Sequence, residues 1–118
     1  MIKFNIEFYK TCSDICPVQD FLDDLKKKDP DDFAIVLAGL AKLRERHYHR
    51  PPLSKPIGGD LFELRHVGKL NTRVIYFFMK GQRIIAVHGI RNKATKIPGI
   101  DLIIAKSRKA DWEKSNSP

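Results

Sequence analysis

Three consecutive apolar segments separated by glycine turns constrain the fold of this chain more than any other feature. Leu61–His66 alternates apolar and polar residues, Thr72–Met79 is almost continuously apolar, and Arg83–Ile90 is rich in β-branched residues. The intervening segments Val67–Lys69 and Lys80-Gly81 each contain a glycine, which favours a tight turn. Strands joined by such short turns pair antiparallel, so the sequence predicts three neighbouring strands of one sheet.

The rest of the chain is expected to add one strand and three helices. Apolar and polar residues alternate over Ile2–Tyr9, which is typical of a half-buried strand. Prolines at first helical positions, aspartates in a first turn and apolar residues at helical spacing indicate the helices. The first helix is predicted from Pro17 to Lys28, the second from about Asp31 to before Arg50-Pro51-Pro52, and the third from Pro98.

The predicted order is β-α-α-β-β-β-α, an α+β fold in which helices cover one face of a small antiparallel sheet. A loop through Gly58-Gly59 is expected to connect the second helix to the three strands. The 118 residues suffice for one domain with a small core, so residues 1–118 are expected to form a single domain whose tail, 115–118, frays.

Hairpin geometry predicts which side chains meet on the sheet. If Lys80-Gly81 is a two-residue loop, Arg73 lies opposite His88, and one register of the preceding turn puts Arg65 opposite Arg73. Like charges facing each other across strands destabilise a sheet by a few tenths to about 1 kcal/mol. Such a row therefore calls for an anion, or for Glu63, which shares the face of Arg65.

The distribution of charge points to the same region. The formal net charge is +8, and residues 42–96 hold 13 lysines and arginines against 3 acidic residues, which accounts for the whole surplus. Two interpretations stay open: a solvated basic surface, or a surface for a polyanion such as nucleic acid or an acidic protein segment.

No segment suggests export, a membrane or a metal. The N-terminus has no apolar h-region, and no apolar run approaches the roughly 20 residues that span a bilayer. We therefore expect a cytoplasmic protein without membrane contact. The spacing of Cys12 and Cys16 fits neither a zinc ribbon nor a redox motif, so two free thiols and no metal site are expected.

Three motifs connect this chain to a known family. They are Phe62-Glu63-Leu64-Arg65, Thr72-Arg73-Val74-Ile75-Tyr76 and His88-Gly89-Ile90-Arg91-Asn92-Lys93, followed by a basic helix after Pro98. In this succession the chain resembles the RelE/ParE superfamily of type II toxins and, within it, the HigB-type, phage-related branch. The resemblance covers nearly the whole chain and implies a RelE-like fold.

The resemblance also implies a function. Toxins of this kind act at the ribosomal A site and cut the translated mRNA as metal-independent endoribonucleases, until an antitoxin sequesters them. The 2′-hydroxyl of one nucleotide attacks the adjacent phosphate, so the site needs a base, an acid and cations, but no cofactor. The antitoxin is expected to be a helix-turn-helix protein, and operator DNA is expected to bind only to the complex.

The family pattern places arginine and lysine on the strands of the site. Arg73 is the first candidate because its sequence context, Arg73-Val74-Ile75-Tyr76, matches the family best, and its fork can hold two phosphate oxygens. The general base is expected to be His88 or Glu63. The alternative for His88 is a neutral histidine in the core, and the alternative for Glu63 is a salt bridge to Arg65 without a catalytic role. Ala94–Gly99 lacks the tyrosine or histidine that serves as the acid in some relatives. The further candidates are Arg65, Arg91 and Lys93 for catalysis, and Lys55, Lys69 and Lys96 for RNA binding.

Two other functions remain open at this point. A ParE-like inhibitor of DNA gyrase shares the fold and binds a protein partner, whereas a non-catalytic nucleic-acid-binding module shows salt-sensitive binding without cleavage. On the nuclease hypothesis, Arg73→Ala is expected to abolish growth arrest while leaving the fold intact.

Overall fold

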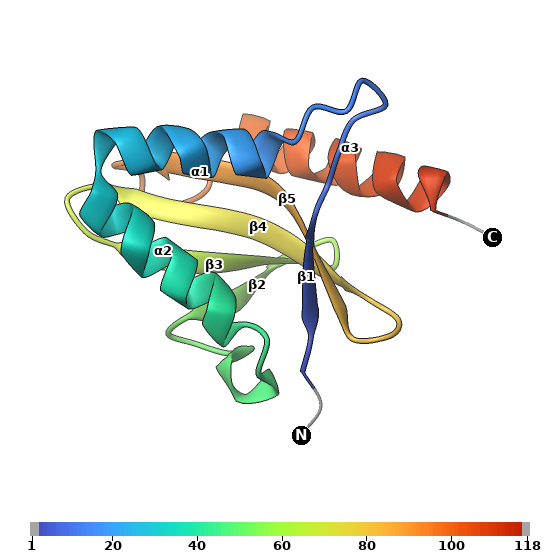
Figure 1. Cartoon of the computed structure of the whole chain (residues 1–118), viewed down its shortest axis with the longest axis horizontal. Coiled ribbons are helices and arrows are strands. Elements are labelled where there is room, and N and C mark those ends of the chain that lie inside the picture. The colour runs from blue at the N-terminus through green and yellow to red at the C-terminus, as the bar shows by residue number, and fades with distance from the viewer. Residues whose placement is uncertain (1–2, 117–118) are drawn as a thin grey trace.

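The structure is a computed structural model that describes residues 3–116. A five-stranded sheet lies between two layers of helix (Figure 1), in the strand order β1-β5-β4-β3-β2. The strands are β1 (Asn5–Phe8), β2 (Ser54–Gly58), β3 (Leu61–Val67), β4 (Asn71–Met79) and β5 (Arg83–Asn92). The helices are α1 (Pro17–Lys28), α2 (Pro30–Lys42) and α3 (Gly99–Ser115), with a 3₁₀ helix at Arg46–Tyr48.

The α+β fold class is confirmed, and the bounds of α1 agree with the prediction. The first strand is shorter than predicted, and the Ile2 end of the predicted segment lies outside the described residues. The second helix ends at Lys42, earlier than the prolines require, and the short 3₁₀ helix follows it. The sheet is also not wholly antiparallel, because β1 pairs with β5 in parallel.

Strand β2 was not predicted, because the sequence analysis assigned this segment to a loop. It pairs antiparallel with β3 and contains Pro56, with a shift of register between Pro56 and Gly58. Proline cannot donate to a strand ladder and is tolerated on an edge strand or beside a bulge, and β2 offers both conditions. The sequence lacks the alternation of a longer strand here, so pairing with β3 decides the conformation.

The register of the sheet confirms one prediction and corrects another. Arg65 lies directly opposite Arg73, as one of the considered registers required. The next turn has three residues instead of two, since Met79 pairs with Arg83, and a bulge lies farther along β4. Arg73 therefore faces Ile90, and the prediction that it faces His88 is wrong.

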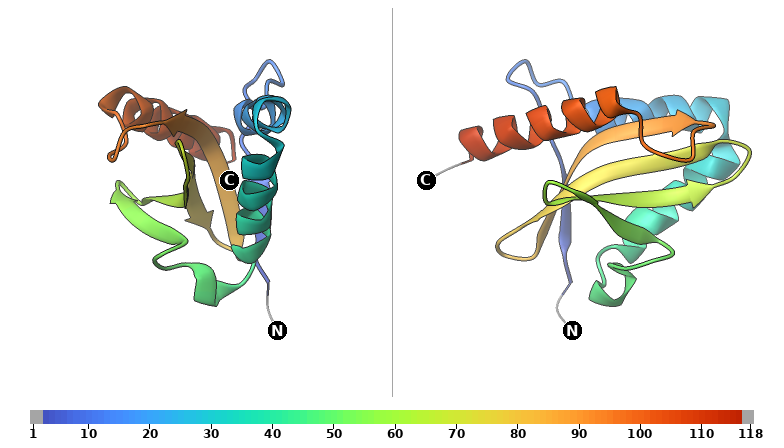
Figure 2. Two further views of the ribbon diagram at one scale, coloured as in Figure 1. Left: turned by 90° about the vertical axis from the view of Figure 1, so that its left-hand side faces the viewer. Right: turned by 180° about the vertical axis from the view of Figure 1, so that it is seen from behind.

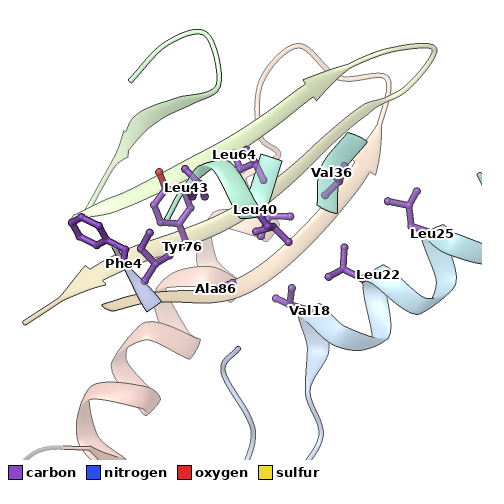
Figure 3. Close-up of a cluster of buried hydrophobic side chains, with 12 residues drawn as sticks. Phe4, Val18, Leu22, Leu25, Val36, Leu40, Leu43, Leu64, Tyr76 and Ala86 are labelled. Atoms are coloured by element: carbon purple, nitrogen blue, oxygen red, sulfur yellow. The ribbon is translucent and has the colours of Figure 1, made fainter. Parts of the chain in front are cut away.

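The helices α1 and α2 cover one face of the sheet. Figure 3 shows their apolar side chains converging on those of β3, β4 and β5. Gly89 of β5 lets α1 approach closely, because a Cβ there would lie 2.3 Å from the ring of Phe21. The buried members of this core are Phe4, Val18, Leu22, Leu25, Val36, Leu40, Leu43, Leu64, Val74, Tyr76, Ile84 and Ala86.

Helix α3 covers the opposite face (Figure 2), so helices lie on both faces rather than on one. The strand β4 is buried on both sides as a result, which explains its continuous apolar run. Trp112 of α3 packs edge-on against Phe77, with ring centroids 5.5 Å apart. The buried members of this second core are Tyr9, Leu61, Ile75, Phe77, Ile85, Val87, Ile90, Ala105 and Trp112. Among residues 3–116, no helix is both long and apolar enough to cross a membrane.

Candidate functional site

A buried ion pair lies on the α3 face of the sheet, between β3 and β4. Arg73 Nε is 3.3 Å from Glu63 Oε2, and the two side chains are only 1% and 2% exposed. On the other side of Glu63, Lys55 of β2 places its Nζ 3.9 Å from Oε1, with half of its own side chain exposed. Burying a carboxylate is costly unless cations and hydrogen bonds compensate it, and here two cations from neighbouring strands do so.

The other end of the Arg73 guanidinium holds the loop between β5 and α3. Its Nη2 donates to the carbonyl oxygens of Ala94 and Thr95, at 3.0 and 2.9 Å. Asn71 Nδ2 donates to the same Ala94 oxygen at 2.8 Å, and the Ala94 amide donates to Asn92 Oδ1 at 3.0 Å. Asn71 and Asn92 are direct partners across β4 and β5, so three strand residues hold this loop through both the amide and the carbonyl group of Ala94.

Two adjacent pockets open beside the ion pair. The first, of about 300 Å³, lies between β2, the fixed loop and the start of α3, and Lys55, Glu63, Arg73 and Lys96 contribute its charged lining. The second, of about 350 Å³, shares Lys55 and Glu63 with it and adds Arg65. Among residues 3–116, the linings of these two pockets together contain four cationic side chains and one carboxylate.

Arg65 and Arg73 have guanidinium nitrogens without hydrogen-bond partners among the described residues. Arg65 and Arg73 face each other across β3 and β4, and Glu63 is the nearest compensating charge on that face. Arg65 Nε and Arg73 Nη1 are buried without a hydrogen-bond partner among the described residues. Buried donors normally have partners, so a ligand with several acceptor oxygens would stabilise this arrangement.

Two further predicted residues lie at the same end of the sheet. Lys69 is exposed in the turn between β3 and β4, whose flanking residues pair with each other. Lys93 is exposed immediately after β5, and begins the loop that Arg73 holds. The structure therefore gathers Glu63, Arg65 and Arg73 with Lys55, Lys69, Lys93 and Lys96 around one end of the sheet.

His88 lies on the same face but both of its ring nitrogens are engaged. Nε2 is 2.7 Å from Asp101 Oδ1, and Nδ1 is 2.9 Å from Arg108 Nη1, which also donates to the Val87 carbonyl oxygen. Burial lowers the pKa of Arg108 below its usual range. Both contacts join β5 to α3, so in this arrangement His88 has no free nitrogen to offer an RNA.

Arg91 lies on the opposite face of the sheet from Arg73. Its Nη2 donates to Asp29 and Asp32 at the junction of α1 and α2, at 2.8 and 2.9 Å. Asp32 also accepts from His66 at 3.0 Å. The hydrogen bond from Arg91, and to a lesser degree the His66 contact, lower the pKa of Asp32. Arg91 therefore joins β5 to the helical pair and does not line the two pockets.

Asn71 and Asn92 are site residues that the sequence analysis missed. Each stands at the end of a strand, where asparagine is common in turns for local reasons. Nothing in the sequence distinguishes a residue that closes its own turn from one that holds a distant loop. Only the register that pairs Asn71 with Asn92 reveals their shared role.

The described residues offer no cluster of three or more histidine, cysteine or acidic side chains suited to a metal ion. Cys12 is exposed, Cys16 is half-buried, and both are free thiols. The charged lining of the two pockets consists of four cations and the carboxylate of Glu63, an excess of positive charge that suits an anionic ligand rather than a cation.

Comparisons with known proteins agree with the resemblance in its broad form. Residues 20–110 match the family of Phage derived protein Gp49-like (DUF891). No curated protein gives a significant match. The matched region extends from α1 to α3, includes both arginines of the facing pair and covers more than half of the chain. The chain therefore belongs to the phage-derived Gp49-like family, a toxin-like family of the RelE type.

Proposed function

We propose that this protein is the toxin of a type II toxin–antitoxin system, in the HigB-like branch, and that it cleaves mRNA on the translating ribosome. The substrate is the RNA backbone, which carries one negative charge per phosphate. The proposed reaction is a metal-independent attack of a 2′-hydroxyl on the adjacent phosphate, which releases the 5′-oxygen of the next nucleotide. The compartment in which it acts is the cytoplasm, where the ribosomes are.

One observation carries this proposal: Arg65 and Arg73 face each other beside two open pockets, and Glu63 is the one carboxylate among the described residues that line them. A gyrase inhibitor needs no such concentration of cations above a buried carboxylate. A phosphate that gains negative charge during cleavage does need it, because fixed cations in a partly dry site stabilise that charge strongly.

The groups in the pockets suggest distinct roles. Arg73 lines the first pocket and Arg65 the second, so their guanidinium groups are our candidates to hold phosphate oxygens. Lys55 and Lys96 are exposed at the rim and can hold the flanking phosphates. Glu63 is our candidate for the base that accepts the 2′-hydroxyl proton, because both ring nitrogens of His88 are engaged elsewhere.

The acid that protonates the leaving oxygen is assigned to a lysine of the fixed loop, Lys93 or Lys96. Both flank Ala94 and Thr95, whose backbone accepts hydrogen bonds from Arg73 and Asn71 and donates one to Asn92. Arg91 is assigned a structural role instead, because two aspartates hold it on the other face.

The test is expression of the chain from a tightly controlled promoter, with primer extension on a translated reporter mRNA. We expect cleavage at codon-spaced positions, which disappears when the start codon of the reporter is removed. Growth arrest with intact mRNA would instead favour the gyrase inhibitor, and binding of RNA without any cleavage would favour the non-catalytic module.

A further inference from the structure

The first of the two pockets beside Arg73 has an apolar as well as a charged lining. Its volume is about 300 Å³, and the described residues around it include four charged and four apolar side chains. A phosphate uses only the charged groups, because an ion gains nothing from apolar contact. A ligand that fills the pocket therefore carries an apolar part beside its negative charge. The apolar side chains are Pro56, Ile57, Ile97 and Leu102.

The protein itself covers this apolar lining only in part. Ile57 and Ile97 pack against the second core, yet both stay half-buried, and so does Leu102 of α3. Part of their surface therefore faces water in the free protein. Removing apolar surface from water is favourable, so a ligand that covers these three side chains gains free energy from the contact.

The pocket is formed before any ligand arrives. The Arg73 guanidinium holds the carbonyl oxygens of Ala94 and Thr95, at 3.0 and 2.9 Å, and Ile97 follows in the same loop. Ile57 belongs to β2, which the pairing with β3 holds in place. A ligand that enters a preformed pocket loses little free energy to the ordering of the protein.

Two kinds of ligand combine negative charge with an apolar part, namely a nucleotide and an acidic, apolar peptide. A peptide also brings backbone N–H and C=O groups that need partners. The carbonyl oxygens of Ala94 and Thr95 already accept hydrogen bonds, and Pro56 on the edge strand β2 has no N–H to offer. The flat faces of a nucleobase need no such partners, so the pocket favours a nucleotide.

We infer that the first pocket is a nucleotide subsite, in which the phosphate lies on the Arg73 guanidinium and the base lies against the apolar lining. The inference rests on the proposed function for the source of this nucleotide, which is the mRNA. No aromatic side chain is among the described residues of the lining, so aliphatic contact replaces the stacking that many RNA-binding proteins use. The pocket thus adds recognition of a base to the binding of the RNA backbone.

Methyl NMR spectroscopy of the full chain tests the subsite directly. The chain is titrated with the four nucleoside 5′-monophosphates and with ribose 5-phosphate, which has the same sugar and phosphate but no base. We expect the nucleotides to bind about 10-fold more tightly than ribose 5-phosphate, because the base covers apolar surface. The nucleotides should also shift the methyl signals of Ile57, Ile97 and Leu102, and ribose 5-phosphate should leave these signals in place.

A pair of neighbouring residues on α3 supplies the variant and its control. Leu102→Ala removes part of the apolar lining and should weaken nucleotide binding by about 3- to 10-fold, while the affinity for ribose 5-phosphate stays unchanged. Ile103→Ala is the matched control, because Ile103 is 64% exposed and is absent from the described lining of the pocket. In the reporter assay, Leu102→Ala should change which bases flank the cleavage sites, and Ile103→Ala should not. The wild-type titration needs no variant, so it decides the question even if Leu102→Ala unfolds.

The outcomes separate this inference from the nuclease proposal. Equal affinity for nucleotides and ribose 5-phosphate overturns the subsite, and so does a shift of these methyl signals by the dipeptide aspartyl-leucine but not by nucleotides. Unchanged bases at the cleavage sites of Leu102→Ala, despite base-dependent binding, would assign the pocket to a free nucleotide and overturn its role toward mRNA. A chain that binds nucleotides as expected but never cleaves mRNA keeps the subsite and loses only the nuclease.

Discussion

Glu63 and Arg73 form an ion pair that is almost completely enclosed, with Nε 3.3 Å from Oε2 and side chains 2% and 1% exposed. The same guanidinium holds two carbonyl oxygens of the loop that follows β5. One residue thus neutralises a buried carboxylate, holds a loop and lines a pocket, while its Nη1 is buried without a hydrogen-bond partner among the described residues. Its position joins the stability of the sheet to the proposed chemistry.

Removing Arg73 should therefore destabilise the protein as well as inactivate it. We expect Arg73→Ala to lower the free energy of unfolding by about 3–5 kcal/mol, because Glu63 is left buried without its main cation. This revises the expectation that the fold stays intact. Urea unfolding followed by circular dichroism measures the loss. In the double variant Glu63→Ala/Arg73→Ala the loss should be smaller than the sum of the single losses, and strict additivity would contradict the coupling.

The rim lysines give a cleaner test of activity. Lys55→Ala and Lys96→Ala should each lower mRNA cleavage by about 10- to 100-fold, which corresponds to the roughly 1.5–3 kcal/mol of a hydrogen bond to a charged group. The melting temperature of Lys96→Ala should stay near that of wild type, since Lys96 is exposed, whereas Lys55→Ala also removes one of the two cations beside Glu63 and should lower it slightly. Lys80→Ala, an exposed lysine in the β4–β5 turn, serves as the matched control in the same cell-free translation assay. Equal activity in all three variants would exclude this pocket as the site.

Asn71 should act through the loop that it holds. Asn71→Ala removes one hydrogen bond to the Ala94 oxygen, so we expect a stability loss of only about 0.5–1.5 kcal/mol but faster amide exchange over residues 94–97. Cleavage should fall, and adding Lys96→Ala should lower it no further than Lys96→Ala does alone. Asn5→Ala, at an exposed asparagine on β1, is the control. Unchanged exchange in the loop would refute the proposed anchoring.

The Asp32 contacts predict a dependence of stability on acid pH. The pKa of Asp32 is lowered in the folded protein, chiefly by the hydrogen bond from Arg91. A carboxylate with a depressed folded pKa contributes stability above its unfolded pKa, about 3.9, and loses it as the pH falls through the folded value. Thermal melts between neutral pH and the acid limit should show this loss. Asp32→Asn should flatten the curve in that window, and an unchanged acid slope would contradict the assignment.

Gly89 is needed for the contact between β5 and α1. A Cβ at this position lies 2.3 Å from the Phe21 ring, so Gly89→Ala should force the ring or the helix to move, at about 1–3 kcal/mol. Replacing the Phe21 ring with a smaller side chain, in the double variant Phe21→Leu/Gly89→Ala, should recover part of the lost free energy of unfolding. Gly99→Ala, where no atom lies within 4 Å of the added carbon, should be close to neutral in the same unfolding experiment.

The elements of this fold were largely readable from the sequence. Proline at the first helical position and the basic last turn fixed α1 at Pro17–Lys28, because these are local preferences of the backbone. The apolar runs and glycine turns gave β3, β4 and β5 for the same reason, and the basic pair Arg65 and Arg73 followed from one hairpin register. Local signals were too weak for β2, whose proline and glycines adopt a strand only beside β3.

The sequence by itself determined the α+β class, most of the strands and helices, the family resemblance and the cluster of cations at one end of the sheet. Only the tertiary structure decided which cations share a face. A three-residue turn and a bulge moved His88 away from Arg73, and two aspartates from the α1–α2 junction hold Arg91 on the opposite side. The physical reason is that register and ion pairing depend on residues far apart in the chain, whereas turns and caps depend on neighbours. The position of α3 on the second face likewise depends on contacts between residues far apart in the chain, such as the packing of Trp112 against Phe77.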